Sequence, residues 1–119
     1  MPINIDINLV EKISTILDET KSENISVVDL KNKTSIADFF VIATCRSSRH
    51  TDSTADEITN QLKSIGVKCP SPSGRPQCDW VIVDAGTVIV HLFRPEIREM
   101  YSLEKLWEMS FDSVENKTA

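Results

Sequence analysis

The feature that most constrains the fold of this chain is the segment Asp-Phe-Phe-Val-Ile-Ala-Thr at residues 38–44. Its apolar residues follow one another without the polar alternation of a half-exposed strand. Such a run is expected for a strand that lies in the middle of a sheet and is buried on both faces. The rest of the chain must then supply the strands and helices that surround it.

Two amphipathic helices are predicted, one on each side of this segment in the sequence. Apolar residues recur every three or four positions from about Asp6 to Thr20, and a second stripe runs to about Ile65. Gly66 is placed to end the second helix in the left-handed conformation. The hydroxyls near the start of the second helix suit capping, and Ser48 is the expected cap. The apolar positions of the two stripes are Leu9, Ile13, Ile16 and Leu17, then Ala55, Ile58, Leu62 and Ile65.

Three further segments, residues 25–30, 80–84 and 88–93, have the β-branched residues typical of strands. The last two flank Ala85-Gly86-Thr87, and two such runs around a short glycine-containing turn predict a hairpin. Residues 67–69 are a candidate short strand.

The segments outside these strands complete the prediction. The prolines and glycine of residues 70–76 predict a loop. A helical region is expected to open at Pro95 and to continue to about Met109, and the polar residues 112–119 are expected to form a disordered tail. Together these segments predict an α/β (α+β) fold, a single domain over residues 1–111 with a mixed β-sheet and flanking helices.

Length and composition exclude several classes of protein. A chain of 119 residues is the size of one domain. It has no apolar run near the roughly 18 residues of a membrane-spanning helix, and its start, Met-Pro-Ile-Asn-Ile-Asp, is unlike a secretory signal. We therefore expect a cytoplasmic protein. The cysteines Cys45, Cys69 and Cys78 form no CxxC pair, so reduced thiols are expected and no metal site is predicted.

The net charge of −5 is unevenly distributed along the chain. Residues 1–30 carry −4, residues 31–75 carry +3 and residues 76–119 carry −4. Proteins that grip nucleic-acid phosphates usually have a dense basic stripe, so little direct RNA binding is expected. An acidic surface suits a basic protein partner, although the charge also fits a role in solubility alone.

The sequence contains no assembled catalytic motif. It lacks GxGxxG, GxxxxGK[ST], GxSxG and HExxH. Residues 47–50, Ser-Ser-Arg-His, suit either an anion-binding helix start or simple capping. Asp84 lies at the end of a strand and lacks a second carboxylate at the alternate position that a two-metal site needs. His91 lies within a strand and faces either a partner or an internal hydrogen bond.

Aromatic residues are concentrated in the last third of the chain, at Trp80, Phe93, Tyr101 and Trp107. Trp and Tyr dominate the energetically important positions of protein interfaces. Trp107 lies on an apolar helical stripe, which favours a core position. Trp80 heads a strand after a loop, so a core role and an interface role both remain open.

The motifs occur in a recognisable order. They are Asp38-Phe-Phe-Val-Ile-Ala-Thr44, Ser47-Ser-Arg-His50, Trp80-Val-Ile-Val-Asp-Ala-Gly86, Val90-His-Leu-Phe93 and Arg98 followed by Tyr101-x-Leu-Glu-x-Leu-Trp107. This ordered set, covering about residues 27–107, resembles the ribosomal silencing factor family, also called Iojap-like proteins. The resemblance implies a fold similar to nucleotidyltransferases without their catalytic carboxylates, and no cofactor or enzymatic activity.

The resemblance also implies a function and a partner. Family members bind the large ribosomal subunit through its ribosomal protein fourteen, prevent the small subunit from joining, and repress translation when nutrients fail. They are often homodimers in isolation. The alternative from another class is a nucleotide-binding or nucleotidyltransferase-like enzyme that uses residues 47–50 and Asp84. By position in the family motifs, the expected partner-binding residues are Trp80, Asp84, His91, Phe93, Arg98 and Tyr101.

This chain departs from the family pattern at three places. The family's Asp-Tyr-Phe is Asp38-Phe39-Phe40 here, which removes a hydroxyl. The usual glycine after the buried strand is Cys45, which puts in doubt a strained turn at that point. The family's Asp-Tyr-Gly-Asp is Asp84-Ala85-Gly86-Thr87, which removes an aromatic ring and a carboxylate from the hairpin tip.

Overall fold

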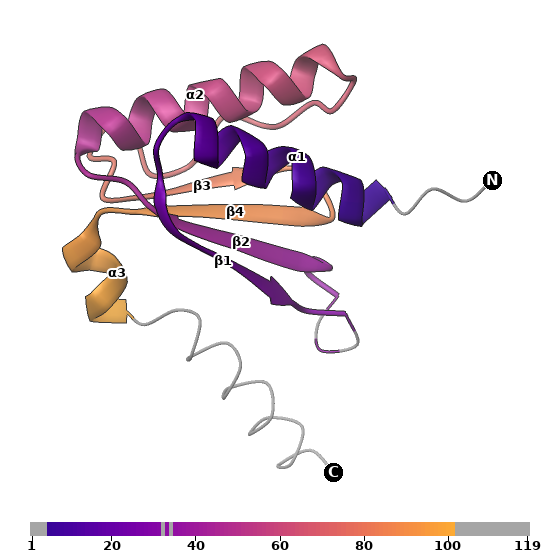
Figure 1. Cartoon of the computed structure of the whole chain (residues 1–119), viewed down its shortest axis with the longest axis horizontal. Coiled ribbons are helices and arrows are strands. Elements are labelled where there is room, and N and C mark those ends of the chain that lie inside the picture. Colours follow the sequence, from indigo (N-terminus) through magenta and orange to yellow (C-terminus); the bar gives the residue numbers. More distant parts are fainter. Residues whose placement is uncertain (1–4, 32, 34, 102–119) are drawn as a thin grey trace, which may run out of the picture.

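The computed structural model describes residues 5–31, 33 and 35–101. The predicted fold class is confirmed, because helices flank one mixed four-stranded sheet (Figure 1). In chain order the elements are α1 (Ile5–Glu19), β1 (Glu23–Asp29), β2 (Phe39–Thr44), α2 (Ser48–Ser64), β3 (Trp80–Asp84), β4 (Val88–Phe93) and α3 (Pro95–Tyr101).

The sheet has the strand order β1-β2-β4-β3. Its two inner strands, β2 and β4, run parallel, and each pairs antiparallel with an edge strand. The prediction of a central strand at residues 38–44 is confirmed, since five of the six residues of β2 are buried. The hairpin is also confirmed, with β3 and β4 joined around Ala85, Gly86 and Thr87.

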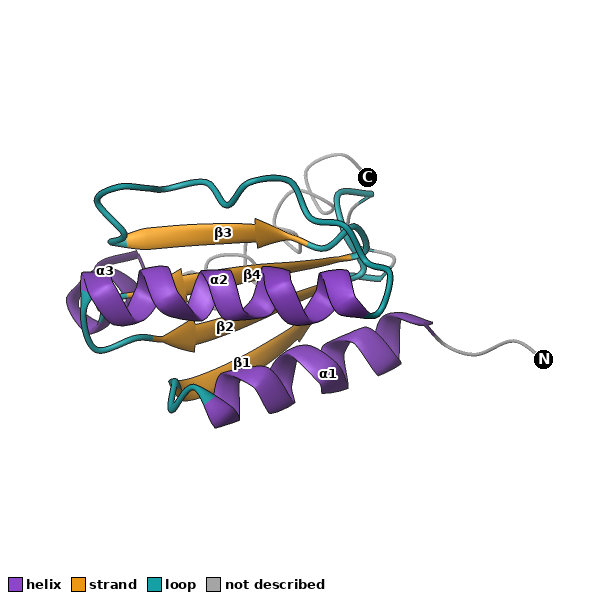
Figure 2. Ribbon diagram, turned by 90° about the horizontal axis from the view of Figure 1, so that it is seen from above, coloured by secondary structure: helices purple, strands orange, loops and turns teal. Residues whose placement is uncertain are grey.

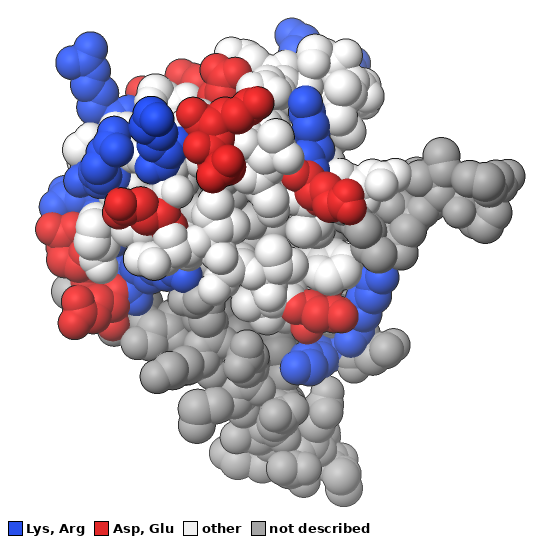
Figure 3. All heavy atoms as spheres, viewed as in Figure 1, with Lys and Arg blue, Asp and Glu red and all other residues white. Residues whose placement is uncertain are grey.

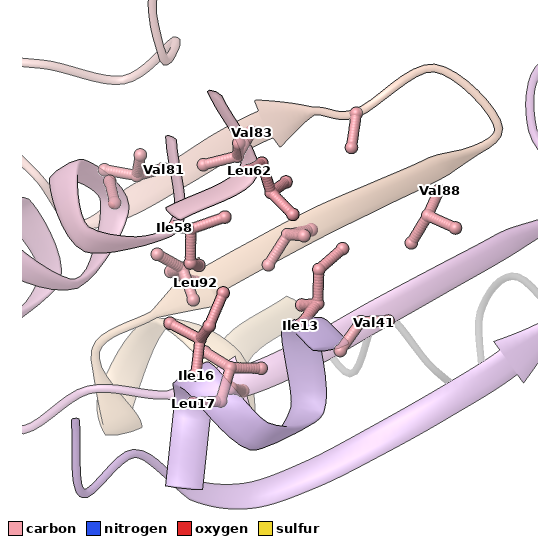
Figure 4. Close-up of a cluster of buried hydrophobic side chains, with 14 of the residues drawn as sticks. Ile13, Ile16, Leu17, Val41, Ile58, Leu62, Val81, Val83, Val88 and Leu92 are labelled. Carbon is pink, nitrogen blue, oxygen red and sulfur yellow. The ribbon is translucent and has the colours of Figure 1, made fainter. Parts of the chain in front are cut away.

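Helices α1 and α2 lie side by side on one face of the sheet (Figures 1 and 2). Their apolar stripes meet every second residue of the strands, as the close-up in Figure 4 shows. Burying one such aliphatic side chain contributes about 1.5–3 kcal/mol, so this cluster is a main source of stability. Its fully buried members include Ile13, Ile16, Leu17, Val41, Ile58, Leu62, Val81, Val83, Val88 and Leu92.

A second apolar cluster lies on the opposite face of the sheet. Its buried members are Val28, Leu30, Ala37, Phe40, Ile42 and Phe93, with Trp80, Ile89 and Ile97 packed against them. Ile97 belongs to α3, so this short helix contributes to the cluster at the end of β4. The sheet is therefore apolar on both faces, as the sequence of β2 predicts.

Three local predictions are corrected. The cap of α2 is Ser47 rather than Ser48, because the Ser47 hydroxyl accepts a hydrogen bond from the backbone N–H of His50 at 3.1 Å. Ile65 is 55% exposed instead of buried, since it lies at the C-cap where the helix has ended. Residues 67–69 form no strand, because the chain there leaves α2 without pairing to the sheet.

Other expectations from the sequence agree with the structure. Gly66 has a φ of +89°, the left-handed conformation predicted for the end of α2. Cys45 is buried after β2 without a left-handed backbone, so no strain accompanies this departure from the family pattern. All three cysteines are free thiols. The predicted helical residues up to Met109, with Trp107, and the tail at 112–119 lie outside the described residues.

Candidate functional site

Four rings form an aromatic cluster on the face of the sheet opposite α1 and α2: Phe40, Trp80, His91 and Phe93. The register brings them together, because Trp80 pairs with Phe93 across β3 and β4, while Ile82 pairs with His91. The Trp80 and Phe93 rings stack with centroids 4.9 Å apart, and the Phe40 and His91 centroids are 4.5 Å apart. The structure therefore joins three of the six predicted site residues.

His91 orients the tryptophan within this cluster. The Trp80 indole N–H donates a hydrogen bond to Nδ1 of His91 at 3.1 Å. Nδ1 is then the acceptor nitrogen of a neutral imidazole, whose proton is on Nε2. Burial lowers the pKa of His91 to about 4, because the charged ring would lose its hydration. The sequence left open whether His91 faces a partner or an internal hydrogen bond, and the structure gives the internal one.

The four rings differ in how deeply they are buried. Phe93 is 0% exposed and His91 is 5% exposed, whereas Trp80 keeps a half-exposed side chain. His91 and Phe93 therefore form a buried support for Trp80, whose own side chain is only partly buried. Phe40 is not among the site residues predicted from the sequence. The sequence feature that could have identified it is the alternation along β2, which places Phe40 and Ile42 on one face of the strand.

The loop before β3 fixes the backbone at Trp80. This loop runs beside the edge of β3 (Figure 2), and Ser73 exchanges two backbone hydrogen bonds with Ile82. Arg75 ties the loop to α2 through ion pairs with Asp52 at 2.7 Å and Asp56 at 2.5 Å. The loop therefore covers the edge of β3, which would otherwise be free to pair with another chain.

Gly74 is the tightest point of this loop. We expect Gly74→Ala to lower the free energy of unfolding by about 2 kcal/mol, because its φ of +105° strains any side chain. A methyl group there would also lie 2.1 Å from the carbonyl oxygen of Trp80. Urea denaturation measures the loss. Gly86→Ala is the matched control, since Gly86 also has a positive φ but nothing lies within 4 Å of an added Cβ. Equal losses in the two variants would show that the contact with Trp80 has no effect.

Asp84 lies at the other end of β3 from Trp80. Its side chain is exposed, and its Oδ1 accepts a hydrogen bond from the backbone N–H of Gly86 at 2.8 Å. This bond is the one by which an aspartate stabilises the turn that follows it. Within the part of the chain that the structure describes, no group of three or more metal-ligating side chains occurs, at Asp84 or elsewhere.

Arg98 connects α3 to the sheet. Its guanidinium donates hydrogen bonds to Oγ1 of Thr44 at 2.8 Å and to the backbone carbonyl of Asn24. These contacts hold α3 against the ends of β1 and β2. Tyr101 is the last residue of α3, and its side chain lies outside the described part of the structure.

The start of α2, the other candidate from the sequence, is satisfied within the chain. His50 Nδ1 accepts from the backbone N–H of Arg46 at 3.0 Å, so Nε2 donates to the carbonyl oxygen of Thr20 at 2.7 Å. The Ser47 hydroxyl caps the helix. These bonds give the residues a structural role, linking α2 to the end of α1. None of the described helices is long and apolar enough to cross a bilayer.

The fold and the aromatic cluster define a small single-domain α+β protein. The family described as ribosomal silencing factor during starvation matches residues 4–119. The ribosomal silencing factor RsfS of Zymomonas mobilis is 38% identical over 88% of this chain and 79% of its own length. The protein of Mus musculus named mitochondrial assembly of ribosomal large subunit protein 1 is 32% identical over 87% of this chain and 47% of its own length.

A solved structure gives the same result. The crystal structure of a Chromobacterium violaceum protein matches with a TM-score of 0.83 and 30% sequence identity, covering 91% of this chain and 88% of that one. The chain belongs to the ribosomal silencing factor family, and the resemblance seen in the ordered motifs of its sequence is confirmed.

Proposed function

We propose that this protein binds the large ribosomal subunit through a basic ribosomal protein, ribosomal protein fourteen, and sterically blocks the small subunit from joining. It represses translation in this way when nutrients are limiting. The family description names silencing during starvation, and the name of the mouse relative includes assembly of the large subunit. Such a mechanism needs affinity for one partner and bulk in the right place, with no bond made or broken.

The observation that carries the proposal is the half-exposed Trp80 on a buried aromatic support. A rigid tryptophan with a preset orientation loses little entropy on binding, which is why this residue is common at interface hot spots. Of the six residues predicted from the sequence, we assign direct contact to Trp80, Asp84 and Tyr101. His91, Phe93 and Arg98 are positioning residues, because each is buried or hydrogen-bonded within the chain.

The charge of the protein supports a protein partner rather than RNA. Figure 3 shows acidic and basic side chains interspersed over one face, and Arg75 and Arg94 are held in ion pairs with carboxylates. With a net charge of −5, the chain attracts a basic protein at long range and is repelled by a phosphate backbone. Its binding to large subunits should therefore weaken with salt.

Co-sedimentation with purified subunits tests the proposal. The protein is expected to pellet with large subunits. It should remain in the supernatant when small subunits are used at the same concentration. Free migration in both cases, at low salt and micromolar protein, would contradict it.

Trp80→Ala is expected to cost about 2 kcal/mol of binding free energy, or roughly thirtyfold in affinity for large subunits. The substitution removes the partly exposed ring, together with its hydrogen bond to His91, and leaves the buried rings beneath it. Fluorescence anisotropy of labelled protein titrated with large subunits measures the change. Ile65→Ala is the control, because Ile65 is also exposed but lies at the end of α2. Unchanged affinity in a folded Trp80→Ala variant would remove this residue from the interface.

A further inference from the structure

A groove lies beside the C-terminal half of α2, on the side of the sheet opposite the aromatic cluster. Its volume is about 380 Å³, and it is lined by Thr59, Asn60 and Lys63 of α2 and by Lys68 and Cys69 of the segment that follows. This volume is within the range of small-molecule sites, which is about 300–1,000 Å³. The proposed ribosome contact uses none of these residues.

Two lysines give the lining of the groove its positive charge. Both lysines are exposed, and among the residues that the structure describes no carboxylate lines the groove or forms an ion pair with either lysine. Burial, together with the nearby Asp84 carboxylate, raises the pKa of the Cys69 thiol. The thiol is therefore neutral at pH 7 and does not cancel the lysine charges.

The ammonium groups of Lys63 and Lys68 can only donate hydrogen bonds. Asn60 adds an amide to the two ammonium groups, while the Thr59 hydroxyl already donates to the carbonyl oxygen of Asp56 at 3.0 Å. The last carbonyls of α2 are also occupied, since those of Leu62 and Lys63 accept from the backbone beyond the helix. The side chains that can donate to an anion here are those of Asn60, Lys63 and Lys68.

We propose that this groove binds a small organic phosphate carrying two adjacent negative charges, up to the size of a nucleotide. Lys63 and Lys68 contact the charged end, and the wall at Cys69 lies against the uncharged part of the ligand. Two lysines on a protein of net charge −5 are too few to hold a long polyanion, which favours a small ligand over a nucleic-acid backbone. None of the five lining residues belongs to the proposed ribosome contact, and Asp84 of that contact lies near Cys69.

Cys69 provides a reporter for the test, because it is half-buried in the groove wall while Cys45 and Cys78 are buried in the core. Alkylation of Cys69 by iodoacetamide is followed by mass spectrometry without magnesium, in the presence of ADP, inorganic pyrophosphate or adenosine. Saturable protection by ADP and by pyrophosphate is expected at concentrations below about 1 mM, with none by adenosine. Tighter protection by ADP than by pyrophosphate identifies an organic phosphate as the ligand class. The proposal would be overturned if all three compounds protected Cys69 equally, or if none protected it. Protection by pyrophosphate alone would contradict the assignment of an organic phosphate as the ligand.

Charge variants complete the experiment. Each of Lys63→Gln and Lys68→Gln is expected to weaken ADP binding by about tenfold, the effect of losing one charge-assisted hydrogen bond. Lys21→Gln and Lys33→Gln change the same charge at exposed positions outside the groove and should leave binding unchanged. Equal weakening in all four would show a general charge effect and contradict the site. The groove variants should still co-sediment with large subunits, so failure of this inference is distinguishable from failure of the proposed function.

Discussion

Phe93→Ala is expected to lower the free energy of unfolding by about 4 kcal/mol. Phe93 is 0% exposed and is among the largest fully buried side chains of the protein. It packs with Phe40 and Ile42 and stacks on Trp80, so the substitution removes apolar burial and leaves a cavity between β2, β3 and β4. Urea denaturation followed by far-ultraviolet circular dichroism measures the loss.

The matched control is Phe39→Ala, in the paired strand β2 but opposite Val88, at the other end of β4 from Phe93. Phe39 is only half-buried and packs against the cluster beneath α1 and α2. It should cost less than half as much as Phe93→Ala. Similar losses for the two phenylalanines would contradict the conclusion that Phe93 is the buried foundation of the aromatic cluster.

Acidification is expected to remove about 3 kcal/mol of stability through His91 alone. Its pKa falls from 6.5 to about 4 in the folded protein, because burial disfavours the charged ring. Between these two pH values the unfolded chain binds a proton that the folded protein does not. The stabilisation is therefore complete above pH 6.5, is lost as the pH falls towards 4, and changes little below that.

A His91→Gln variant isolates this effect, because glutamine does not titrate. The free energy of unfolding is measured for both proteins between pH 4 and pH 6.5. The wild-type curve should be steeper than that of the variant by up to about 1.4 kcal/mol per pH unit. Parallel curves would contradict a neutral, buried His91, whatever the absolute stability of the variant.

Most of the fold was predictable because its signals are local. The apolar run of β2, the three-and-four spacing of α1 and α2, and the hairpin turn at Gly86 each depend on residues close in sequence. The errors were local as well. Ser47 and Ser48 are chemically equivalent as caps, and only the backbone path shows which hydroxyl reaches the N–H of His50.

The candidate site was less predictable, because it is made by pairing between distant segments. The parallel pairing of β2 with β4 places Phe40 beside His91, and no spacing in the sequence encodes that contact. The hydrogen bond from Trp80 to His91 could be predicted only if the register of β3 on β4 were known. Arg98 was predicted as a contact residue from its motif, whereas the structure shows its hydrogen bonds to Thr44 and Asn24.

We propose that this protein occupies the large subunit in place of the small subunit. The most direct test mixes purified large and small subunits with and without the protein and separates them on a density gradient. We predict that the protein lowers the peak of joined ribosomes and travels with free large subunits, and that Trp80→Ala restores joining. An undiminished peak of joined ribosomes, with the protein left at the top of the gradient, would contradict the claim.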